Sequence, residues 1–186
     1  MKTTARDILT PCIVDEASFR AALRQVSGSV CIVTTGHAPH RHGLTVTAAC
    51  SLTADPPTVL VCINKSAGAH DTIVRTGVFG WNILRPDHVV LAKKFSGQDG
   101  SKGDMRFDDD QWTSLVTGVP ILVDSPCSFD CQVTGMHAVA THTVFYGAVV
   151  AERHRNDGVD LVFRNGGFAV PNTVSQNGSD VTSKSE

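Results

Sequence analysis

The segment NKSAGAHDT, residues 64–72, places a lysine and a serine directly before a stretch with helical character. If Ser66 caps that helix, its hydroxyl, the Lys65 ammonium group and the free N–H groups of the first turn converge at the positive end of the helix dipole. Such an arrangement binds anions, phosphate in particular. An ordinary capped surface helix would show the same pattern, so this segment alone leaves both interpretations open.

A threonine-rich segment at residues 42–57, HGLTVTAACSLTADPP, offers hydroxyl groups where an exposed strand would normally carry charges. Its alternation predicts one strand with an apolar face, formed by Leu44, Val46, Ala48, Cys50 and Leu52. The opposite face would carry Thr45, Thr47, Ala49, Ser51 and Thr53. Hydroxyls and small residues of this kind let a neutral planar heterocycle approach the backbone and bond to it. The segment also fits a solvent-facing strand, because threonine has a high β propensity.

His142 lies in the apolar segment ATHTVFYG and shares a predicted strand face with Val144 and Tyr146, the only tyrosine of the chain. A neutral imidazole can donate a hydrogen bond to an amide carbonyl or carry a proton near pH 7. A structural histidine would fit the same position, and the pattern does not separate the two roles.

Three histidines, His37, His40 and His42, form an HxxHxH pattern that could bind a metal ion. Their segment also contains glycine and proline, and no carboxylate or thiolate on a rigid element lies nearby in the sequence. Zinc needs ligands in fixed geometry with supporting partners. Cys127 and Cys131 share a face of a predicted strand, which indicates packing. We therefore predict no metal site.

Composition restricts the class of protein. The chain has 186 residues, 41% hydrophobic and 18% charged, which fits one globular domain with a sizeable core. Its net charge of -2 provides no basic surface for nucleic acid. No apolar run is long enough to span a membrane, the N-terminus lacks an apolar signal segment, and the six cysteines form no CxxC pair. We expect a cytoplasmic protein with reduced thiols.

The elements that would position these groups are mostly strands. Helices are predicted over residues 15–28, with an apolar face of Phe19, Ala22, Leu23 and Val26, over 67–76 with Gly77 as its end, and from Pro86 to 95. Further strands are predicted over residues 29–35, 58–64, 78–84, 127–133, 140–154 and 160–170. Residues 96–111 have the composition of a flexible polar loop. Many short strands with few helices predict a mainly-β fold, an antiparallel barrel or sandwich with helical inserts.

The order of these segments resembles the short-chain flavin reductase family. The resemblance rests on TVTAACSLTADPP combined with CINKSAGAHDTI, followed by VFGWNIL, LAKKF, GVP and a late strand histidine before GAVV. It implies the fold of that family, a split antiparallel β-barrel with short helical inserts that binds FMN. It covers about residues 15–170, so we expect 1–14 to be a lead-in and 171–186 to be a disordered polar tail.

The resemblance also implies a set of flavin-binding residues. The isoalloxazine ring and ribityl chain would lie along Thr45, Val46, Thr47, Ala48, Cys50, Ser51 and Leu52, with Thr47 and Ala48 nearest the ring. The phosphate end would be held by Ser51, Lys65, Ser66 and His70, with Asn64 close by. Ala92 and Phe95 would pack on the far side of the ring, and Phe168 occupies a position where the family commonly has an aromatic residue.

His142 corresponds to a late histidine that in similar proteins lies beside the nicotinamide, which makes it the expected catalytic residue. The family often has Gly-Asp before this histidine, where this chain has Ala140-Thr141. The implied reaction is reduction of FMN or FAD by NADH or NADPH, after which a partner monooxygenase receives the reduced flavin. A homodimer is implied as well.

Hydride transfer mainly requires the two rings to be held against each other, which agrees with the lack of any paired catalytic carboxylates or nucleophile motif. Three other functions fit parts of the sequence: a flavin-binding electron carrier without catalysis, a histidine/cysteine metal protein, and an enzyme of the same barrel acting on pyridoxamine phosphate. The sequence does not distinguish NADH from NADPH, FMN from FAD, or bound flavin from flavin as substrate.

Overall fold

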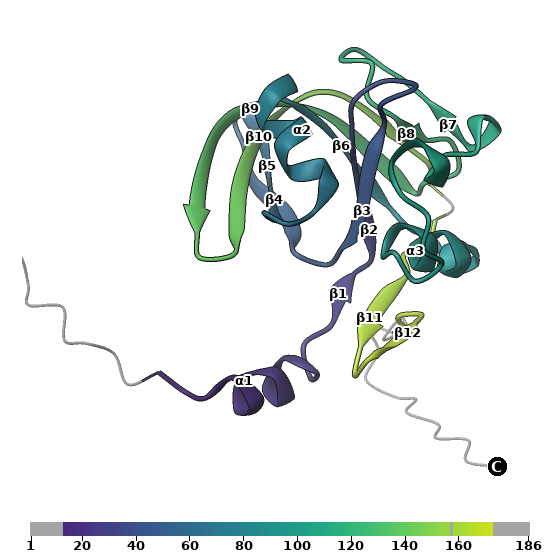
Figure 1. Cartoon of the computed structure of the whole chain (residues 1–186). Helices are drawn as coiled ribbons and strands as arrows, with labels where there is room; N and C mark the ends of the chain where they lie inside the picture. The colour runs from purple at the N-terminus through teal and green to yellow at the C-terminus, as the bar shows by residue number, and fades with distance from the viewer. Residues whose placement is uncertain (1–12, 157, 173–186) are drawn as a thin grey trace, which may run out of the picture.

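An antiparallel sheet of seven strands forms the body of the molecule in the computed structural model, which describes residues 13–156 and 158–172 (Figure 1). Its order is β3-β2-β6-β9-β10-β5-β4. The strands are β2 (Cys31–Thr35), β3 (His42–Val46), β4 (Ala49–Ala54), β5 (Pro57–Asn64), β6 (Val78–Ile83), β9 (Cys127–Val139) and β10 (His142–His154). Most of the expected lead-in and tail lie outside the described residues. No helix in the described part of the chain is long and apolar enough to cross a membrane.

The two outermost strands of this sheet, β3 and β4, are joined by only Thr47 and Ala48. So short a link brings the opposite edges of the sheet together, so the sheet curls into a barrel that is split between these strands. This confirms the predicted mainly-β fold, a split antiparallel barrel with short helical inserts.

The same link corrects the prediction of one continuous strand over residues 42–57. Leu44 and Val46 pack on the core from β3, but on β4 the residue that packs on it is Ala49. The alternation therefore shifts by one residue where the chain crosses between the two edges. Cys50 is exposed and Leu52 is 52% exposed, so both lie on the outer face of the sheet and not in the interior.

Strand β2 is buried on both faces because it separates two hydrophobic cores. Cys31 and Val33 belong to the first core, together with Val59, Val61, Ile63, Phe79, Trp81 and Phe145. Val30 and Ile32 belong to the second, together with Leu84, Ala92, Phe95, Phe107, Trp112, Leu122 and Leu161. Burial raises the pKa of the Cys31 thiol to about 12, so this thiol is neutral at pH 7.

Helix α2 (Gly68–Thr76) begins differently from the prediction. Ser66 does not cap it: its backbone N–H and its hydroxyl both donate to the side-chain oxygen of Asn64, each over 2.9 Å. The N-cap position is Ala67, which has no side-chain hydrogen bond. The end at Gly77 is confirmed, since this residue has the left-handed φ of 69° that glycine adopts readily.

The region of residues 86–111 covers the second core. Pro86–His88 form a 3-10 turn that leads into α3 (Val89–Phe95), as expected from the proline. The segment 96–111 is not simply a polar loop, because it contains 3-10 turns at Gly103–Arg106 and Asp109–Gln111 and places Phe107 in the core. Arg106 fastens it by donating from Nη1 to the carbonyl oxygens of Gly43 and Phe95. The short strands β7 (Trp112–Thr113) and β8 (Ile121–Leu122) follow.

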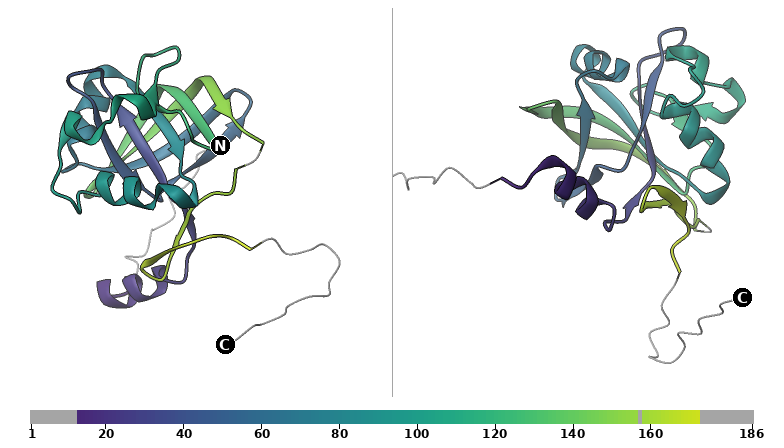
Figure 2. Two further views of the ribbon diagram at one scale, coloured as in Figure 1. Left: turned by 90° about the vertical axis from the view of Figure 1, so that its right-hand side faces the viewer. Right: turned by 60° about the horizontal axis from the view of Figure 1, so that its bottom comes forward.

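Residues 160–170 form a hairpin and not the single predicted strand. Strands β11 (Val162–Arg164) and β12 (Gly167–Ala169) are joined by Asn165 and Gly166, whose φ values are 51° and 80°. Such positive φ values suit a tight two-residue turn. The hairpin pairs with β1 (Gly28–Ser29) and lies below the barrel with the N-terminal helix α1 (Glu16–Leu23) (Figures 1 and 2).

The ion pair between Arg41 and Asp104 holds the 96–111 segment against β3 and leads to a prediction about pH. Arg41 donates from Nε to Asp104 over 2.6 Å, and this hydrogen bond lowers the pKa of the Asp104 carboxyl. A lowered folded-state pKa adds stability above the unfolded value of about 3.9, and this stability is lost as the pH falls through the folded value. We expect Asp104→Asn to lower stability at pH 7 by about 0.5–1 kcal/mol, as for a partly exposed ion pair.

Urea denaturation from pH 7 to pH 3 would check this prediction. The difference between the wild type and Asp104→Asn should shrink as the pH approaches 3. Asp110→Asn is a suitable control because Asp110 is an exposed neighbour for which the structure shows no ion pair among the described residues. A difference that stays constant over this pH range would contradict the proposed contribution of the ionised carboxylate.

Candidate functional site

A pocket of about 230 Å³ lies between β3, the end of α3 and the β11–β12 hairpin. Its lining consists of Val30, Thr45, Val46, Thr47, Ala92, Ser96, Gln98, Phe163 and Phe168. No charged side chain is among them. The structure thus brings together five residues that were expected to contact one ring, namely Thr45, Val46, Thr47, Ala92 and Phe168.

The chemistry of this lining suits a neutral aromatic ring. The Thr45 hydroxyl donates to the Ala92 carbonyl over 2.7 Å and so ties β3 to α3 at the pocket. Phe163 and Phe168 meet edge to face, with ring centroids 5.5 Å apart. The amide of Gln98 and the hydroxyls of Ser96 and Thr47 add neutral donors and acceptors. Because the pocket is smaller than the usual range of about 300–1,000 Å³, a flavin would extend beyond it onto the surface.

Thr47 occupies a junction, since it lines two further hollows besides this pocket. One of about 570 Å³ lies between α1 and the hairpin, and the other of about 650 Å³ lies beneath the barrel beside β1. Gly28 passes close to Thr47, and a Cβ on Gly28 would lie 3.1 Å from the Thr47 Cβ. Because glycine has no side chain, the space beside Thr47 stays open. The link between β3 and β4 is therefore exposed, and its Thr47 borders all three hollows.

A second group of expected site residues gathers where β5 ends and the β9–β10 hairpin turns. Asn64 and His142 are cross-strand partners, and the backbone N–H of Lys65 donates to Thr141. The Lys65 ammonium group donates to the Ala140 carbonyl over 2.7 Å. His142 is exposed and lies with Val144 and Tyr146 on the outer face of the sheet. None of these residues lines the 230 Å³ pocket.

His70 is placed in a different way from the other candidate phosphate ligands. Its two ring nitrogens lie 2.8 Å from an Asp71 carboxylate oxygen and 2.9 Å from the Thr143 hydroxyl, and its side chain is only 13% exposed. Its ring also packs edge to face on Phe145. The imidazole therefore joins α2 to Thr143 of β10, on the strand face opposite His142, and both of its ring nitrogens have partners.

Five further expected contacts do not line the pocket: Ala48, Cys50, Ser51, Leu52 and Phe95. Ser51 pairs with Val59 on β5, five residues before Asn64, so about 16 Å of strand separates Ser51 from the Lys65 region. Cys50 and Leu52 flank it on the outer face. Phe95 is 1% exposed and packs against Gly43. A Cβ on Gly43 would lie 2.6 Å from the Phe95 ring. Its ring belongs to the second core and contacts Phe107 and Trp112.

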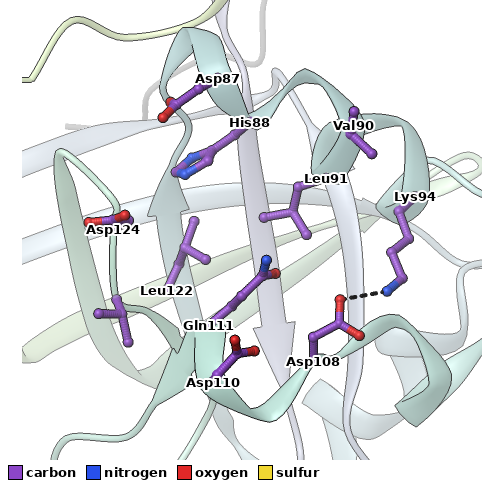
Figure 3. Close-up of a pocket in the computed structure, with 11 residues that line it drawn as sticks. Asp87, His88, Val90, Leu91, Lys94, Asp108, Asp110, Gln111, Leu122 and Asp124 are labelled. Carbon is purple, nitrogen blue, oxygen red and sulfur yellow. Dashed lines mark hydrogen bonds and ion pairs between the residues drawn. The ribbon is translucent and has the colours of Figure 1, made fainter.

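A separate hollow of about 480 Å³ lies on the outer side of α3 (Figure 3). The side chains of Asp87, Asp110 and Asp124 point around its rim, and Lys94 is paired with Asp108 over 2.9 Å. Burial lowers the pKa of His88, so this imidazole is neutral at pH 7 and does not offset the carboxylates. A rim of carboxylates repels phosphate groups, and none of the expected flavin-binding residues lines this hollow.

The loop histidines do not assemble into a metal site in the part of the chain that the structure describes. His37 lies 3.0 Å from the Gly118 carbonyl through Nδ1, while His42 begins β3 beside Gly68. Across residues 13–156 and 158–172, no group of three His, Cys, Asp or Glu side chains is arranged to hold a metal ion.

The family model for the flavin reductase like domain matches residues 23–171 of this chain. The chain belongs to this family. A curated relative, FMN reductase (NADH) RutF of Pantoea ananatis (strain LMG 20103), is 39% identical over 144 residues, which are 77% of this chain and 75% of the relative. Among flavin reductases of known structure, PheA2 superposes with a TM-score of 0.77 at 28% identity and covers 86% of this chain and 100% of its own. BorF, the flavin reductase component of a bacterial two-component tryptophan halogenase, superposes with a TM-score of 0.77 at 25% identity. The match covers 84% of this chain and 98% of BorF.

Within this flavin reductase like domain, the sequence interpretation missed four residues of the pocket: Val30, Ser96, Gln98 and Phe163. Ser96 and Gln98 follow α3 directly, where a polar segment after a helix gives no sign of which side chains turn inward. Phe163 faces Phe168 across the hairpin. The Asn-Gly pair at residues 165–166 is a known hairpin signal and would have placed these two rings together.

Proposed function

We propose that this chain uses NADH to reduce FMN and passes the reduced flavin to a partner monooxygenase. The relative named FMN reductase (NADH) supports FMN and NADH over the alternatives, FAD and NADPH. BorF, as a component of a two-component system, supports a flavin-dependent oxygenase as the acceptor. The fold and the order of motifs agree with both.

The observation that carries this proposal is the uncharged pocket between Thr45, Thr47, Ala92 and Phe168. When bound there, a flavin supplies the ring that accepts a hydride from the nicotinamide. Val46 lines the pocket beside that ring, and the adjoining phenylalanines exclude water from one side. Ala48, expected near the ring, does not line the pocket, and its carbonyl accepts from the Cys62 N–H over 2.9 Å. The protein thus contributes position and a low-polarity surface, and no proton donor is required.

The phosphate end of the flavin is assigned to Lys65 and Ser66, with Asn64 positioning Ser66. Lys65 supplies the charge, and its contact with the exposed Ala140 carbonyl can be exchanged for a phosphate oxygen. Because His70 has both ring nitrogens in use, we assign it a supporting role behind His142. Ser51 is assigned to the ribityl side along β4, and Phe95 supports the pocket from behind Gly43. Cys50 and Leu52, which lie on the outer face of the sheet, are not assigned a flavin contact.

An assay of NADH oxidation at 340 nm with FMN tests the activity directly. Parallel reactions with FAD and with NADPH would establish both cofactor preferences. A non-catalytic flavin carrier, the closest alternative, would bind FMN without any flavin-dependent loss of absorbance. That result would overturn the proposed function, although it would leave the fold assignment unchanged.

His142 is proposed as the catalytic residue that contacts the nicotinamide. We expect His142→Ala to lower kcat/KM for NADH roughly fivefold, the effect of one lost hydrogen bond of about 1 kcal/mol, with little change in flavin affinity. Steady-state kinetics and titration of flavin fluorescence would measure the two effects separately. His137→Ala, an exposed histidine on the same hairpin, serves as the control. Equal losses of turnover and flavin binding would assign His142 a structural role.

A homodimer is proposed from the outer face of β4, β5 and β10. Antiparallel sheets that face water usually carry polar residues on that face, but here Cys50, Leu60 and Tyr146 are cross-strand neighbours, and Cys62 pairs with Val144. A second copy of the chain would cover this apolar strip. His142 lies at its end, so dimerisation would bring a second subunit close to the proposed nicotinamide contact.

Leu60→Glu places a charge in the middle of this strip and should shift the dimer to monomer in sedimentation velocity experiments. Val90→Glu is the matched control, because Val90 is 78% exposed on α3, away from the strip. A thermal melt of each variant would show that both remain folded. A Leu60→Glu variant that folds and sediments like the wild type would exclude this face as the interface.

The domain boundaries and the compartment complete the proposal. We place the flavin reductase domain at residues 15–170, with a lead-in before it and a polar tail after it. The family match at residues 23–171 supports this placement.

We place the protein in the cytoplasm because the five cysteines within the described residues are free thiols, as a reducing compartment maintains them.

A further inference from the structure

The hollow between α1 and the β11–β12 hairpin is a second site that continues from the flavin pocket. It measures about 570 Å³ and shares Thr47 and Phe163 with that pocket. Three of its lining residues are arginines, Arg20, Arg24 and Arg164, and no acidic side chain lines it. A concavity of this size with convergent cationic groups is suited to a phosphate-bearing ligand.

Two of these guanidinium groups are available for a ligand. Arg20 is paired with Glu16 over 2.6 Å on the surface of α1. For Arg24 and Arg164, the structure shows no ion pair with any carboxylate in residues 13–156 or 158–172. The planar fork of arginine matches the oxygen atoms of phosphate, and a charge-assisted pair of this kind is about twice as strong as a neutral hydrogen bond.

The hairpin turn holds these two arginines at the same end of the hollow. The N–H of Asn165 donates to the Arg24 carbonyl over 2.8 Å, which joins the end of α1 to the turn. The Nη1 atom of Arg24 lies 3.5 Å from the place of a Cβ on Gly166. Because Gly166 has no side chain, the guanidinium group can rest against the turn next to Arg164.

Besides the arginines, the lining contains the uncharged polar residues Ser27, Thr47 and Asn165 and three apolar side chains that the core does not use. Leu23, Val26 and Phe163 are 48%, 62% and 38% exposed although they face this hollow. An aromatic side chain beside short apolar ones offers a stacking surface for a purine base. Phosphate-binding arginines next to such a surface are the features that recognise a nucleoside diphosphate.

We propose that this hollow binds the adenosine diphosphate part of NADH, with Arg24 and Arg164 on the diphosphate. This inference rests on the proposed function. FAD contains the same group, but its adenylate extends from the flavin phosphate, which is assigned to Lys65 and Ser66, and neither residue lines this hollow. NADH with its nicotinamide against the flavin ring would instead reach the hollow past Thr47 and Phe163.

The test uses an Arg24→Gln/Arg164→Gln double variant of the full chain. We expect the KM for NADH to rise at least roughly tenfold and the KM for FMN to stay within about twofold. Arg75→Gln, on the exposed last turn of α2, is the control and should behave as the wild type. Calorimetric titration with ADP alone gives a readout without turnover: the wild type and the control should bind it, and the double variant should not.

The outcomes separate this inference from the proposed function. Equal binding of ADP by the wild type and the double variant would overturn the inference, while flavin-dependent NADH oxidation would still support the function. A rise in KM for FAD without a change for NADH would also overturn it and assign the hollow to FAD. If the wild type oxidises no NADH with any flavin, the function fails, and the ADP titration still decides whether the arginines bind a nucleotide.

Discussion

Replacing Thr47 by tryptophan is expected to weaken flavin binding at least roughly tenfold, equivalent to about 1.4 kcal/mol, and to lower NADH oxidation at limiting flavin in parallel. Thr47 lines the flavin pocket and both neighbouring hollows, so an indole at this position would occupy space that the ring needs. Thr47 is exposed, and its replacement should leave the core intact. Titration of flavin fluorescence gives the affinity, and the assay at 340 nm gives the rate.

Two further variants make this prediction specific. Thr47→Ser keeps the hydroxyl and adds no bulk, so its flavin affinity should remain close to that of the wild type. Thr53→Trp places the same indole on an exposed threonine of β4 that lines none of the three hollows. If Thr53→Trp and Thr47→Trp weakened flavin binding equally, the effect would come from the barrel as a whole, and the pocket beside Thr47 would lose its assigned role.

The strands and the ring side of the site were predictable because their signals are local. The apolar runs at residues 58–64 and 78–84 form β5 and β6 within one residue of the predicted limits. Thr45 and Thr47 line an uncharged pocket, and their flavin contact stays a proposal. The residues proposed to face the ring are small or hydroxylated, as contact with a flat, neutral surface would require.

The corrections arise where distant parts of the chain decide the local structure. The alternation from Leu44 to Leu52 continues through Thr47 and Ala48 without any visible break, yet the chain crosses there from one sheet edge to the other. Ser66 has the residue type of a helix cap, but Asn64 takes its hydrogen bonds. Phe107 is a single aromatic residue in a polar segment, and only the second core explains its burial.

The N-terminal helix shows the same limit in another form. The helix was predicted over residues 15–28, but α1 ends at Leu23, so Val26 of the predicted apolar face lies outside it. Helix α1 also buries no residue, and Phe19 is 53% exposed. An amphipathic pattern predicts that a helix covers something; it does not name the surface that it covers. In this molecule α1 forms one wall of the arginine-lined hollow, which no motif in the sequence indicated.

Replacing Gly147 by alanine is expected to destabilise the barrel by about 1–3 kcal/mol, because the new methyl group has no space. Its Cβ would lie 2.5 Å from one atom of the Phe79 ring and 3.0 Å from the Cβ of Cys131, and both residues are fully buried. Removing glycine from a strand is by itself favourable by about 0.5–1 kcal/mol, which is too little to offset such a clash. Urea denaturation monitored by circular dichroism measures the net effect.

Gly135→Ala separates the clash from the general effect of glycine in a strand. Gly135 lies on the paired strand β9, and its Cβ would meet only Tyr146 at 3.4 Å, an ordinary contact distance, so this variant should be neutral or slightly more stable. Shortening the opposing ring with Phe79→Leu should make the Gly147→Ala change less harmful than it is in the wild type. If the two substitutions were additive, the ring of Phe79 would not be what requires glycine at position 147, and the packing of the first core would need another explanation.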